Sequence, residues 1–460
     1  MTQNSATLAG NLTKFQIFKA TDSSDVSVDM LGACVELKYY ESVLSNTISA
    51  SAIIVETGFT DTTNEDGDPI MGIIDTLPVR GGEPVLLEFA DAQPEPNKLS
   101  FKTNDTALYV NRLRNLDPGT QKDVYVIDLC TREFLANEQT RVVKRYDEKI
   151  SDNVKTILTE QGGIQIKKNI NIDETAIPYN FIGNQKKPFY LCTWLASRSV
   201  PVINVEGESN VDGKGGAAGY FFFENYEGFQ FRSLDKLLDQ KREPVKKYIY
   251  TGNESYPPEY DGHILNVNVD RDIDLQQNLA LGTYANRSIF FNYASMEYLG
   301  RDYNIEDNQK DKIVNAGDQD IAWVAPAFRK GPSRLMNHIL DVGTLPSGDD
   351  AVEQLKNRKA DPTKPTWDAE DTMVQSIMRY NQLFTIKINI MIPGDFSLKA
   401  GDLIFCDFPL LTTDVNTQVN DQSGGIYMIA SLCHRITTSD TYTSLSLVRD
   451  TFGRKAQPTP

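Results

Sequence analysis

Two distant segments of this chain share one pattern of apolar and polar residues. Gly82–Phe89 (GEPVLLEF) aligns with Gly401–Phe408 (GDLIFCDF). Each follows a run in which apolar and polar residues alternate, Ile48–Val55 in the first case and Thr385–Ile392 in the second. Such alternation is typical of β-strands that bury one face. Because a repeat decides the architecture before any other signal does, we expect one β unit to occur twice.

A second stretch extends the repeat. Leu108–Phe134 aligns without a gap on Ile426–Phe452, which matches Tyr109 with Tyr427, Ile127 with Leu445, Leu129 with Leu447 and Phe134 with Phe452. In a strand, Ile127 and Leu129 would lie on one face, as would Leu445 and Leu447 in theirs. The alignment therefore matches buried positions with buried positions. The alternative is chance similarity between two hairpins of like composition, since the frame contains few identities.

The 460 residues are too many for one ordinary core and suggest about three domains. We expect a β domain over residues 1–134, a smaller α+β domain over 135–245 and a second β domain over 246–460. The last contains a polar, loop-rich insertion near 300–370. The predicted fold class is therefore mainly β, and α+β when the whole chain is considered.

Local patterns predict several elements in the last two domains. Helices are expected near Ser151 and from Pro188, and a hairpin turns at Asn225–Gly228. A further strand is predicted where apolar residues alternate with polar ones, at Leu265, Val267, Val269, Ile273 and Leu275.

Composition limits the partners and the compartment. A net charge of −17, from 46 basic and 63 acidic residues, disfavours tight binding of nucleic acid. It is explained by solubility, or by a surface that DNA passes without adhering. The 5 cysteines are scattered, which fits a reducing cytoplasm and no disulfide framework. We expect no membrane span and no secretory signal, because no long apolar run occurs.

Motifs that would carry chemistry are incomplete. None of the 3 histidines is spaced as a metal-binding pair. The acidic loop around Asp66 has Thr62 and Ile73 where an EF-hand needs its first and twelfth ligands. The motif at Gly213–Gly219 precedes a strand, whereas a dinucleotide site needs a helix there. We expect no enzyme, no cofactor and no metal site.

Four segments of the chain resemble the baseplate central hub proteins of contractile-tailed phages of the T-even type. More distantly, they resemble the hub halves of type VI secretion and tailocin spikes. The long polar stretch near 300–370 departs from the family. The segments that carry the resemblance are Tyr40–Val55, Gly81–Phe89, Ala218–Ser233, and Phe396–Ile404 together with Gly425–Met428 and Tyr442–Asp450.

The resemblance implies two tube-like antiparallel β-barrel domains in each chain and a ring-forming homotrimer of pseudo-sixfold symmetry. Such a ring would join the sixfold tail tube to the threefold central spike. Its channel would let DNA pass without specific binding, and we expect some aspartates and glutamates of the tube domains to line it. The implied location is the virion, after assembly in the cytoplasm of a bacterial host.

The implied partners are other copies of this chain, the central spike or tail lysozyme protein, tail tube or tube-initiator proteins, the tape measure protein and the baseplate wedge proteins. The family-motif positions have structural roles in the tube domains. They are Gly82, Glu83, Phe89 and Tyr109 in the first domain, and Gly401, Asp402, Phe408 and Tyr427 in the second.

Two other classes of protein remain open. An all-β adhesin or carbohydrate-binding virion protein would need an exposed aromatic platform, and the tryptophans Trp194, Trp323 and Trp367 are scattered among predicted helices and loops. An acid hydrolase would need two carboxylates across a cleft, and carboxylates are too numerous for the sequence to exclude this arrangement.

Overall fold

The computed structural model describes residues 9–19, 27–57, 79–93, 95–103, 105–117, 122–202, 217–239, 246–250, 262–271, 274–292, 296–305, 314–317, 324–339, 353, 360–361, 364–409, 420 and 422–453. The acidic loop around Asp66, residues 213–216, Ile273 and Trp323 lie outside the described residues, as does much of the stretch near 300–370.

The N-terminal part of the chain forms an antiparallel unit, which we call unit A. Its strands follow one another in the order β3-β4-β8-β7-β5-β1-β2, and β6 pairs with β5. The strands are β1 (Asn11–Phe18), β2 (Ser27–Asp29), β3 (Cys34–Ser42), β4 (Ser49–Glu56), β5 (Pro84–Ala90), β6 (Lys98–Phe101), β7 (Leu108–Asp117) and β8 (Asp123–Thr131).

The C-terminal part forms a similar unit, unit B, in the order β15-β19-β22-β21-β20-β14. All its pairs are antiparallel except β14 with β20. The strands are β14 (Lys246–Ile249), β15 (Asn266–Arg271), β19 (Ile386–Pro393), β20 (Leu403–Asp407), β21 (Gly425–Thr437) and β22 (Thr441–Arg449).

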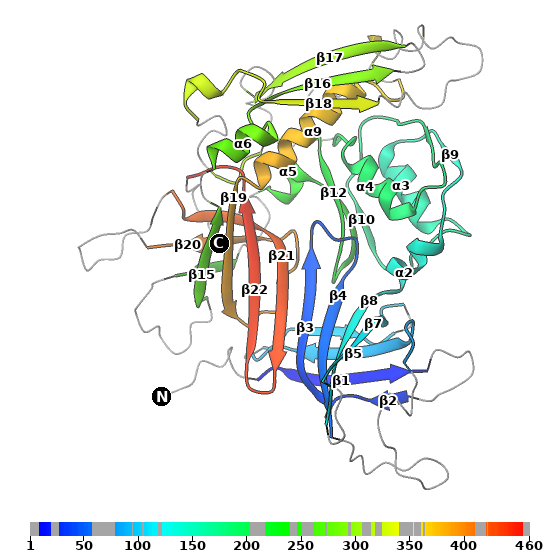
Figure 1. Cartoon of the computed structure of the whole chain (residues 1–460), viewed down its shortest axis with the longest axis vertical. Helices are drawn as coiled ribbons and strands as arrows, with labels where there is room; N and C mark the ends of the chain where they lie inside the picture. Colours follow the sequence, from blue (N-terminus) through cyan, green and yellow to red (C-terminus); the bar gives the residue numbers. More distant parts are fainter. Residues whose placement is uncertain are drawn as a thin grey trace.

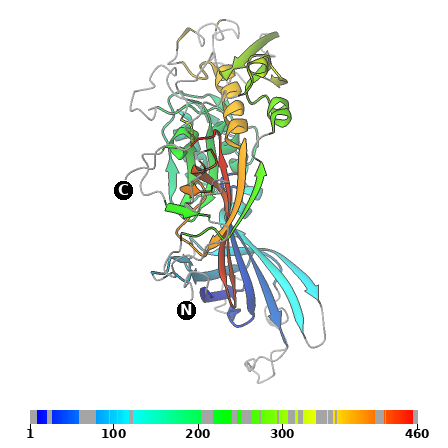
Figure 2. The same ribbon diagram turned by 90° about the vertical axis from the view of Figure 1, so that its left-hand side faces the viewer.

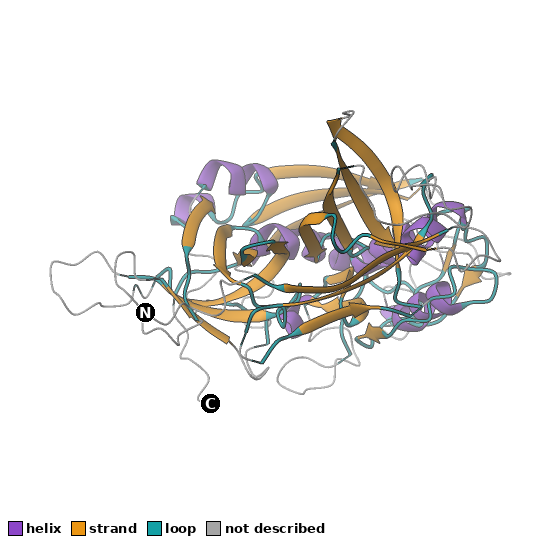
Figure 3. Cartoon of the chain, turned by 90° about the horizontal axis from the view of Figure 1, so that it is seen from below, coloured by secondary structure: helices purple, strands orange, loops and turns teal. Residues whose placement is uncertain are grey.

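The two units are parts of one sheet, because β21 of unit B also pairs with β3 of unit A (Figure 1). Two separate barrels were expected. The described strands instead form one sheet of 14 strands, in which neither unit closes on itself. The long strands run as one curved layer through the lower half of the molecule (Figure 2), and strands dominate the view from below (Figure 3).

The same pairing pattern occurs in both units. Ala50 of β4 lies opposite Leu129 of β8, as Ile388 of β19 lies opposite Leu447 of β22. Between β7 and β8 the register shifts after Val110, and between β21 and β22 it shifts after Ile429. The predicted matches of Ile127 with Leu445 and of Leu129 with Leu447 agree with this pairing.

The gap-free alignment is wrong by one residue in β7. Tyr109 lies opposite Cys130, and Met428 lies opposite Val448 at the corresponding rung, so Tyr109 corresponds to Met428 and not to Tyr427. A second shift in β7, between Asn115 and Asp117, adds the extra residue Leu116. The alignment therefore needs a gap of one residue at this bulge.

The match of Phe134 with Phe452 also fails. Phe134 lies in the helix α2 (Arg132–Gln139), whereas Phe452 follows the end of β22 without entering a helix. The two units thus diverge as soon as β8 and β22 end.

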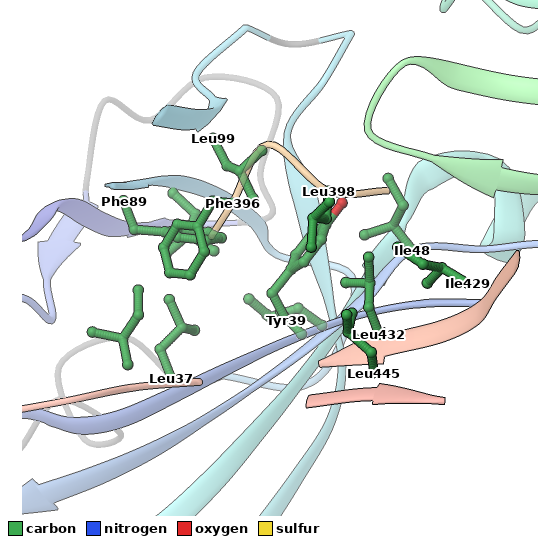
Figure 4. Close-up of a cluster of buried hydrophobic side chains, with 14 of the residues drawn as sticks. Leu37, Tyr39, Ile48, Phe89, Leu99, Phe396, Leu398, Ile429, Leu432 and Leu445 are labelled. Carbon is green, nitrogen blue, oxygen red and sulfur yellow. The ribbon is translucent and has the colours of Figure 1, made fainter. Parts of the chain in front are cut away.

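One hydrophobic core joins the two units. Alternate residues of the long strands point into it, and side chains of both units meet there (Figure 4). Phe89 contacts Phe396 edge-on at 5.5 Å between ring centroids, which ties β5 to the segment before β20. The shared core explains why the units form one body.

A smaller α+β domain follows unit A, and its predicted helices and hairpin are confirmed. Helix α4 starts at Pro188, and in the hairpin Asn225 lies opposite Gly228. Its elements after α2 are β9 (Arg145–Tyr146), α3 (Ile150–Thr159), β10 (Ile170–Ile172), β11 (Phe181–Ile182), α4 (Pro188–Ala196), β12 (Tyr220–Asn225), β13 (Gly228–Ser233) and α5 (Leu234–Leu237).

A three-stranded sheet and a long helix interrupt unit B. The helix α9 (Ala369–Leu383) packs on one face of the sheet β17-β16-β18. The stretch near 300–370 therefore contains regular structure, and Leu275, predicted in a strand, begins a helix that Asp274 caps. The other elements are α6 (Leu275–Leu281), β16 (Ala285–Asn292), β17 (Glu297–Asn304), η2 (Pro326–Phe328) and β18 (Arg334–Ile339).

Candidate assembly surfaces

Gly82 and Gly401 occupy matching turns. Their φ angles are 90° and 89°, in the left-handed region that favours glycine. The N–H of Gly82 donates to the carbonyl of Val110 at 2.7 Å, and the N–H of Gly401 donates to the carbonyl of Ile429 at 2.9 Å. The two turns therefore lead into β5 and β20 in the same way.

The acidic residue after each glycine holds its turn. The carboxylate of Glu83 accepts the backbone N–H groups of Arg80 at 2.7 Å and Gly81 at 2.9 Å. The carboxylate of Asp402 accepts the N–H of Lys399 at 3.0 Å. These predicted positions are local turn-forming residues, since each carboxylate satisfies backbone donors beside it.

The four predicted aromatic positions do not form one set. Phe89, Phe408 and Tyr427 are buried, and the rings of Phe408 and Tyr427 meet edge-on at 6.3 Å. Tyr109 lies on the opposite face of the sheet and is partly exposed. By contrast, Met428, the counterpart of Tyr109 in unit B, is fully buried.

The junction between the units is a strand pairing, Ser431–Thr437 of β21 with Glu36–Ser42 of β3. His434 lies opposite Tyr39, and their rings stack at 5.8 Å. Burial lowers the pKa of His434 to about 4, so the imidazole is neutral. The junction thus resembles the interior of a sheet more than a contact between domains.

The tip of the β12–β13 hairpin enters this junction. The carboxylate of Glu41, at the end of β3, accepts the hydroxyl of Tyr39 at 2.7 Å, the N–H of Tyr226 at 2.7 Å and the N–H of Ala400 at 2.8 Å. Burial raises the pKa of Glu41 to about 7, although these hydrogen bonds oppose the shift. One buried side chain therefore connects unit A, unit B and the hairpin.

Glu224 connects the same hairpin to unit A. Its carboxylate accepts the hydroxyl of Thr131 at 2.9 Å and the N–H of Ile48 at 3.3 Å, and it pairs with Lys168 at 2.7 Å. Although burial opposes it, the carboxylates of Glu224 and Glu133 raise the pKa of Lys168. The hairpin thereby fixes both units relative to the middle domain.

Sequence reasoning did not single out Glu41 or Glu224. A signal existed, because Glu224 interrupts the apolar run of β12 and a carboxylate in such a run requires a buried partner. Its partners come from 56 to 176 residues away in the sequence, so their identity was not visible.

Two edges of the large sheet carry exposed apolar side chains. Among the described strands, β15 pairs on one side only, and β7 beyond Val110 pairs only with β8. Leu116 on β7 is 55% exposed and Val269 on β15 is 52% exposed. Open strand edges are templates for pairing with another chain.

The sheet face opposite the core carries a row of small polar side chains. Directly opposed residues of five strands form the row, and the hydroxyl of Ser446 donates to the side-chain oxygen of Asn389 at 2.7 Å. We call this the polar row. It lines a groove of about 640 Å³ and consists of Asn268, Asn389, Ser446, Ser431 and Ser42.

Two other kinds of site find no support within the described ranges. No helix there is long and apolar enough to cross a bilayer. No cluster of three His, Cys, Asp or Glu side chains there could hold a metal ion.

The fold is similar to that of a tail protein of known structure. A tail protein from Neisseria meningitidis MC58 aligns with this chain at a TM-score of 0.50 and 9% identity, over 95% of this chain and 96% of that chain. The resemblance inferred from the sequence motifs is thus confirmed as a likeness of fold. No protein-family model matches the sequence, and no curated protein does.

Two further solved structures are similar over nearly the whole chain. The 43 kDa tail protein of prophage MuSo2 from Shewanella oneidensis has a TM-score of 0.45 and 8% identity, over 97% of this chain and 99% of that one. An E. coli component of the type VI secretion system has a TM-score of 0.39 and 9% identity, over 97% and 81%.

Proposed function

We propose that this chain is a structural, non-enzymatic baseplate hub of a contractile phage tail. Three copies form a pseudo-sixfold ring that joins the sixfold tail tube to the threefold central spike and leaves a channel for DNA. The ring is part of the virion and is assembled in the host cytoplasm. The tail-protein fold and the two units of matching topology support this proposal.

The observation that carries the proposal is the junction between the units. Inside the chain, His434 of β21 lies opposite Tyr39 of β3. The shared pairing pattern makes Asn115 of β7 the counterpart of His434, and Val269 of β15 the counterpart of Tyr39. The open edges can therefore repeat between chains the pairing that β21 and β3 make within one chain.

In such a ring the polar row would face the channel, because the other sheet face is filled by the core. This replaces the expected acidic lining by an uncharged one. Beyond the row, two carboxylates have cationic partners: Glu36 bonds to Arg435 and Lys38, and Asp128 lies 3.3 Å from Arg114. A surface of this kind offers few fixed charges to a passing phosphate backbone.

Neighbours in the baseplate follow from symmetry. A ring with sixfold pairing on one face accepts the tail tube or a tube-initiator protein. Its threefold features accept the central spike or tail lysozyme protein, while wedge proteins surround it and the tape measure protein lies on the axis. These partners belong to the proposal and follow from the hub role.

Cysteine cross-linking tests the ring at residue level. In the double variant Asn115→Cys, Val269→Cys, opposed residues of neighbouring chains would have Cα atoms about 4.5–5.5 Å apart, which a disulfide can span. We expect oxidation to give a closed, covalent trimer of 154.5 kDa, three times the 51.5 kDa of one chain, by light scattering in denaturant.

The control pairs Asn115→Cys with Val143→Cys, since Val143 is 68% exposed but lies in the middle domain, away from both edges. It should give no covalent trimer. If the first pair also stays monomeric at high protein concentration, with and without the co-expressed spike protein, the ring is wrong.

A carbohydrate-binding virion protein is the second candidate, and one observation favours it. Tyr298 is 74% exposed and contacts Phe291, with the rings tilted by 38° and their centroids 4.8 Å apart, on the face of β17-β16-β18 that α9 does not cover. A glycan-binding assay with Tyr298→Ala decides: loss of a measurable affinity supports this function, and absence of binding by the unaltered chain removes it.

A further inference from the structure

Unit B carries an apolar patch on the sheet face away from the shared core, and other elements of the chain cover it. Leu403, Phe405 and Met428 of the patch are at most 7% exposed. Phe223 of β12 and Leu237 of α5 pack over it, and a Cβ atom added to Gly401 would come within 3.0 Å of the Phe223 ring.

The same positions of unit A form a patch that the chain leaves partly open. Pro84, Leu86 and Tyr109 correspond to Leu403, Phe405 and Met428 through the shared register, and all three are partly exposed. We call these three residues the unit A patch. A Cβ atom added to Gly82, beside the patch, would meet no described atom within 4 Å, in contrast to Gly401.

Chain direction determines what comes near this patch in the ring. Within the chain, β3 runs antiparallel to β21, so the residue that follows β3, Val43, reaches the patch of unit B and donates its N–H to the carbonyl of Ala430 at 2.9 Å. Antiparallel pairing of β15 with β7 of a neighbouring chain would bring the segment after β15 to the unit A patch in the same way.

The first described residues after β15 are the cap and the first turn of α6, and one side of this helix is apolar and incompletely buried. Leu275 and Leu279 lie one turn apart on the helix and are both partly exposed. Asp274 caps the helix by accepting the N–H of Gln277 at 2.9 Å, so the first turn, with Leu275, is held in place.

We propose that the first turn of α6 from a second copy of this chain docks on the unit A patch, with Leu275 over Tyr109 and Gly82. The docking rests on the proposed ring, and it fills in unit A the space that Phe223 and Leu237 fill in unit B. The partner is thus another copy of this chain. The docking contact is apolar, whereas the strand pairing beside it is made by backbone groups.

Photo-cross-linking locates the partner directly. The photoreactive residue p-benzoylphenylalanine replaces Tyr109, an aromatic side chain of similar shape, in the full-length protein. We expect irradiation to link it to the peptide that contains residues 274–281 of another chain, as mapped by mass spectrometry. The matched control carries the same probe at Tyr190, which is 53% exposed on α4, and should not capture that peptide.

A second measurement uses charge. Leu275→Asp should weaken trimer formation by about tenfold or more, because it places a carboxylate on an apolar contact. Gln276→Asp adds the same charge to the neighbouring exposed position of the same helical turn and should leave the trimer unchanged.

The outcomes separate this inference from the ring itself. If the Asn115–Val269 disulfide forms but the probe at Tyr109 captures another segment, the docking of α6 is wrong and the ring stands. If no disulfide forms under any condition, both are wrong. Equal effects of Leu275→Asp and Gln276→Asp on the trimer would also overturn the docking.

Discussion

Gly82 and Gly401 share one backbone conformation but differ in the side chains that pack against them. Gly82 and Gly401 have the same φ and the same hydrogen bond, yet only Gly401 lies under an aromatic ring. The turn itself needs a left-handed backbone, whereas the space above the turn depends on neighbours that differ between the units. The two glycines therefore allow conformational strain to be separated from packing.

We expect Gly401→Ala to destabilise the chain more than Gly82→Ala does. Both variants incur about 1–2 kcal/mol of backbone strain at positive φ. Only at Gly401 must the new methyl group also displace the Phe223 ring, at 3.0 Å, or Leu237, at 3.4 Å. Urea unfolding of both variants measures the difference, and equal losses of unfolding free energy would contradict the packing argument.

Glu41 makes the stability depend on pH. Its folded-state pKa of about 7 lies above the ordinary value of about 4.5 for a free glutamate, so the folded chain binds the proton more tightly. This contribution is complete below about pH 4.5 and is lost as the pH rises through 7. The unfolding free energy of the unaltered chain, relative to Glu41→Gln, should therefore fall by up to about 3 kcal/mol between pH 5 and pH 8.

The measurement is chemical unfolding of both proteins over that range, and Glu227→Gln is the control, because Glu227 is an exposed carboxylate on the same hairpin tip. A constant difference between the unaltered chain and Glu41→Gln would show that Glu41 is ionised in the folded chain throughout this range, against the raised pKa.

At the scale of elements, the β12–β13 hairpin holds the two units at a fixed relation. It does so with buried polar contacts through Glu41, Glu224 and Lys168, in addition to the apolar packing of Phe223 on unit B. Such contacts stabilise only when every partner is present, because an uncompensated buried charge is costly. The hairpin should therefore be sensitive to the loss of one partner.

Lys168→Met should cost about 3–5 kcal/mol of unfolding free energy, because it leaves Glu224 buried without its cation. The neighbouring Lys167 supplies the control: it is 69% exposed and pairs with Asp105 at 3.2 Å. Lys167→Met should change the unfolding free energy by less than about 1 kcal/mol. Thermal unfolding of both variants checks this, and similar midpoints would contradict the buried-charge argument.

Elements with strong periodicity were predictable from the sequence, and long-range pairing was not. The alternation of Thr385–Ile392 and the turn at Asn225–Gly228 depend on neighbouring residues, and both agree with the structure. The bulge at Leu116 is visible only in the pairing of β7 with β8. The gap-free alignment therefore placed β7 one residue out of register. Leu275 failed because helix capping by Asp274 outweighs a short alternating pattern.

The candidate surfaces were predictable only in part. The glycines and acidic residues of the two turns stood out because both turns use them. The junction of β21 with β3 joins residues roughly 400 positions apart, and no local pattern encodes such a pairing. The open edges of β7 and β15 are likewise a property of the complete sheet.

For the molecule as a whole, the proposed trimer depends on pairing between the two open edges. Val269→Glu places a charge on the edge of β15, where it should block pairing with another chain and leave the monomer intact, since Val269 is already half exposed. We expect a monomer by light scattering and a thermal midpoint within about 2–4 °C of the unaltered chain.

Val143→Glu is the matched control, because Val143 is exposed but lies on neither edge. It should leave assembly unchanged. A trimer that survives Val269→Glu at low protein concentration would place the contact between chains elsewhere.

The polar row has a use beyond its place in the proposed channel. Its five side chains stand on five neighbouring strands, about 4.8 Å from one strand to the next, and none of them belongs to the core. Chemical groups attached at Asn268, Asn389, Ser446, Ser431 and Ser42 would stand side by side at a known spacing. The protein is therefore a rigid support on which catalytic or fluorescent groups can be arranged in a line without redesign of its packing.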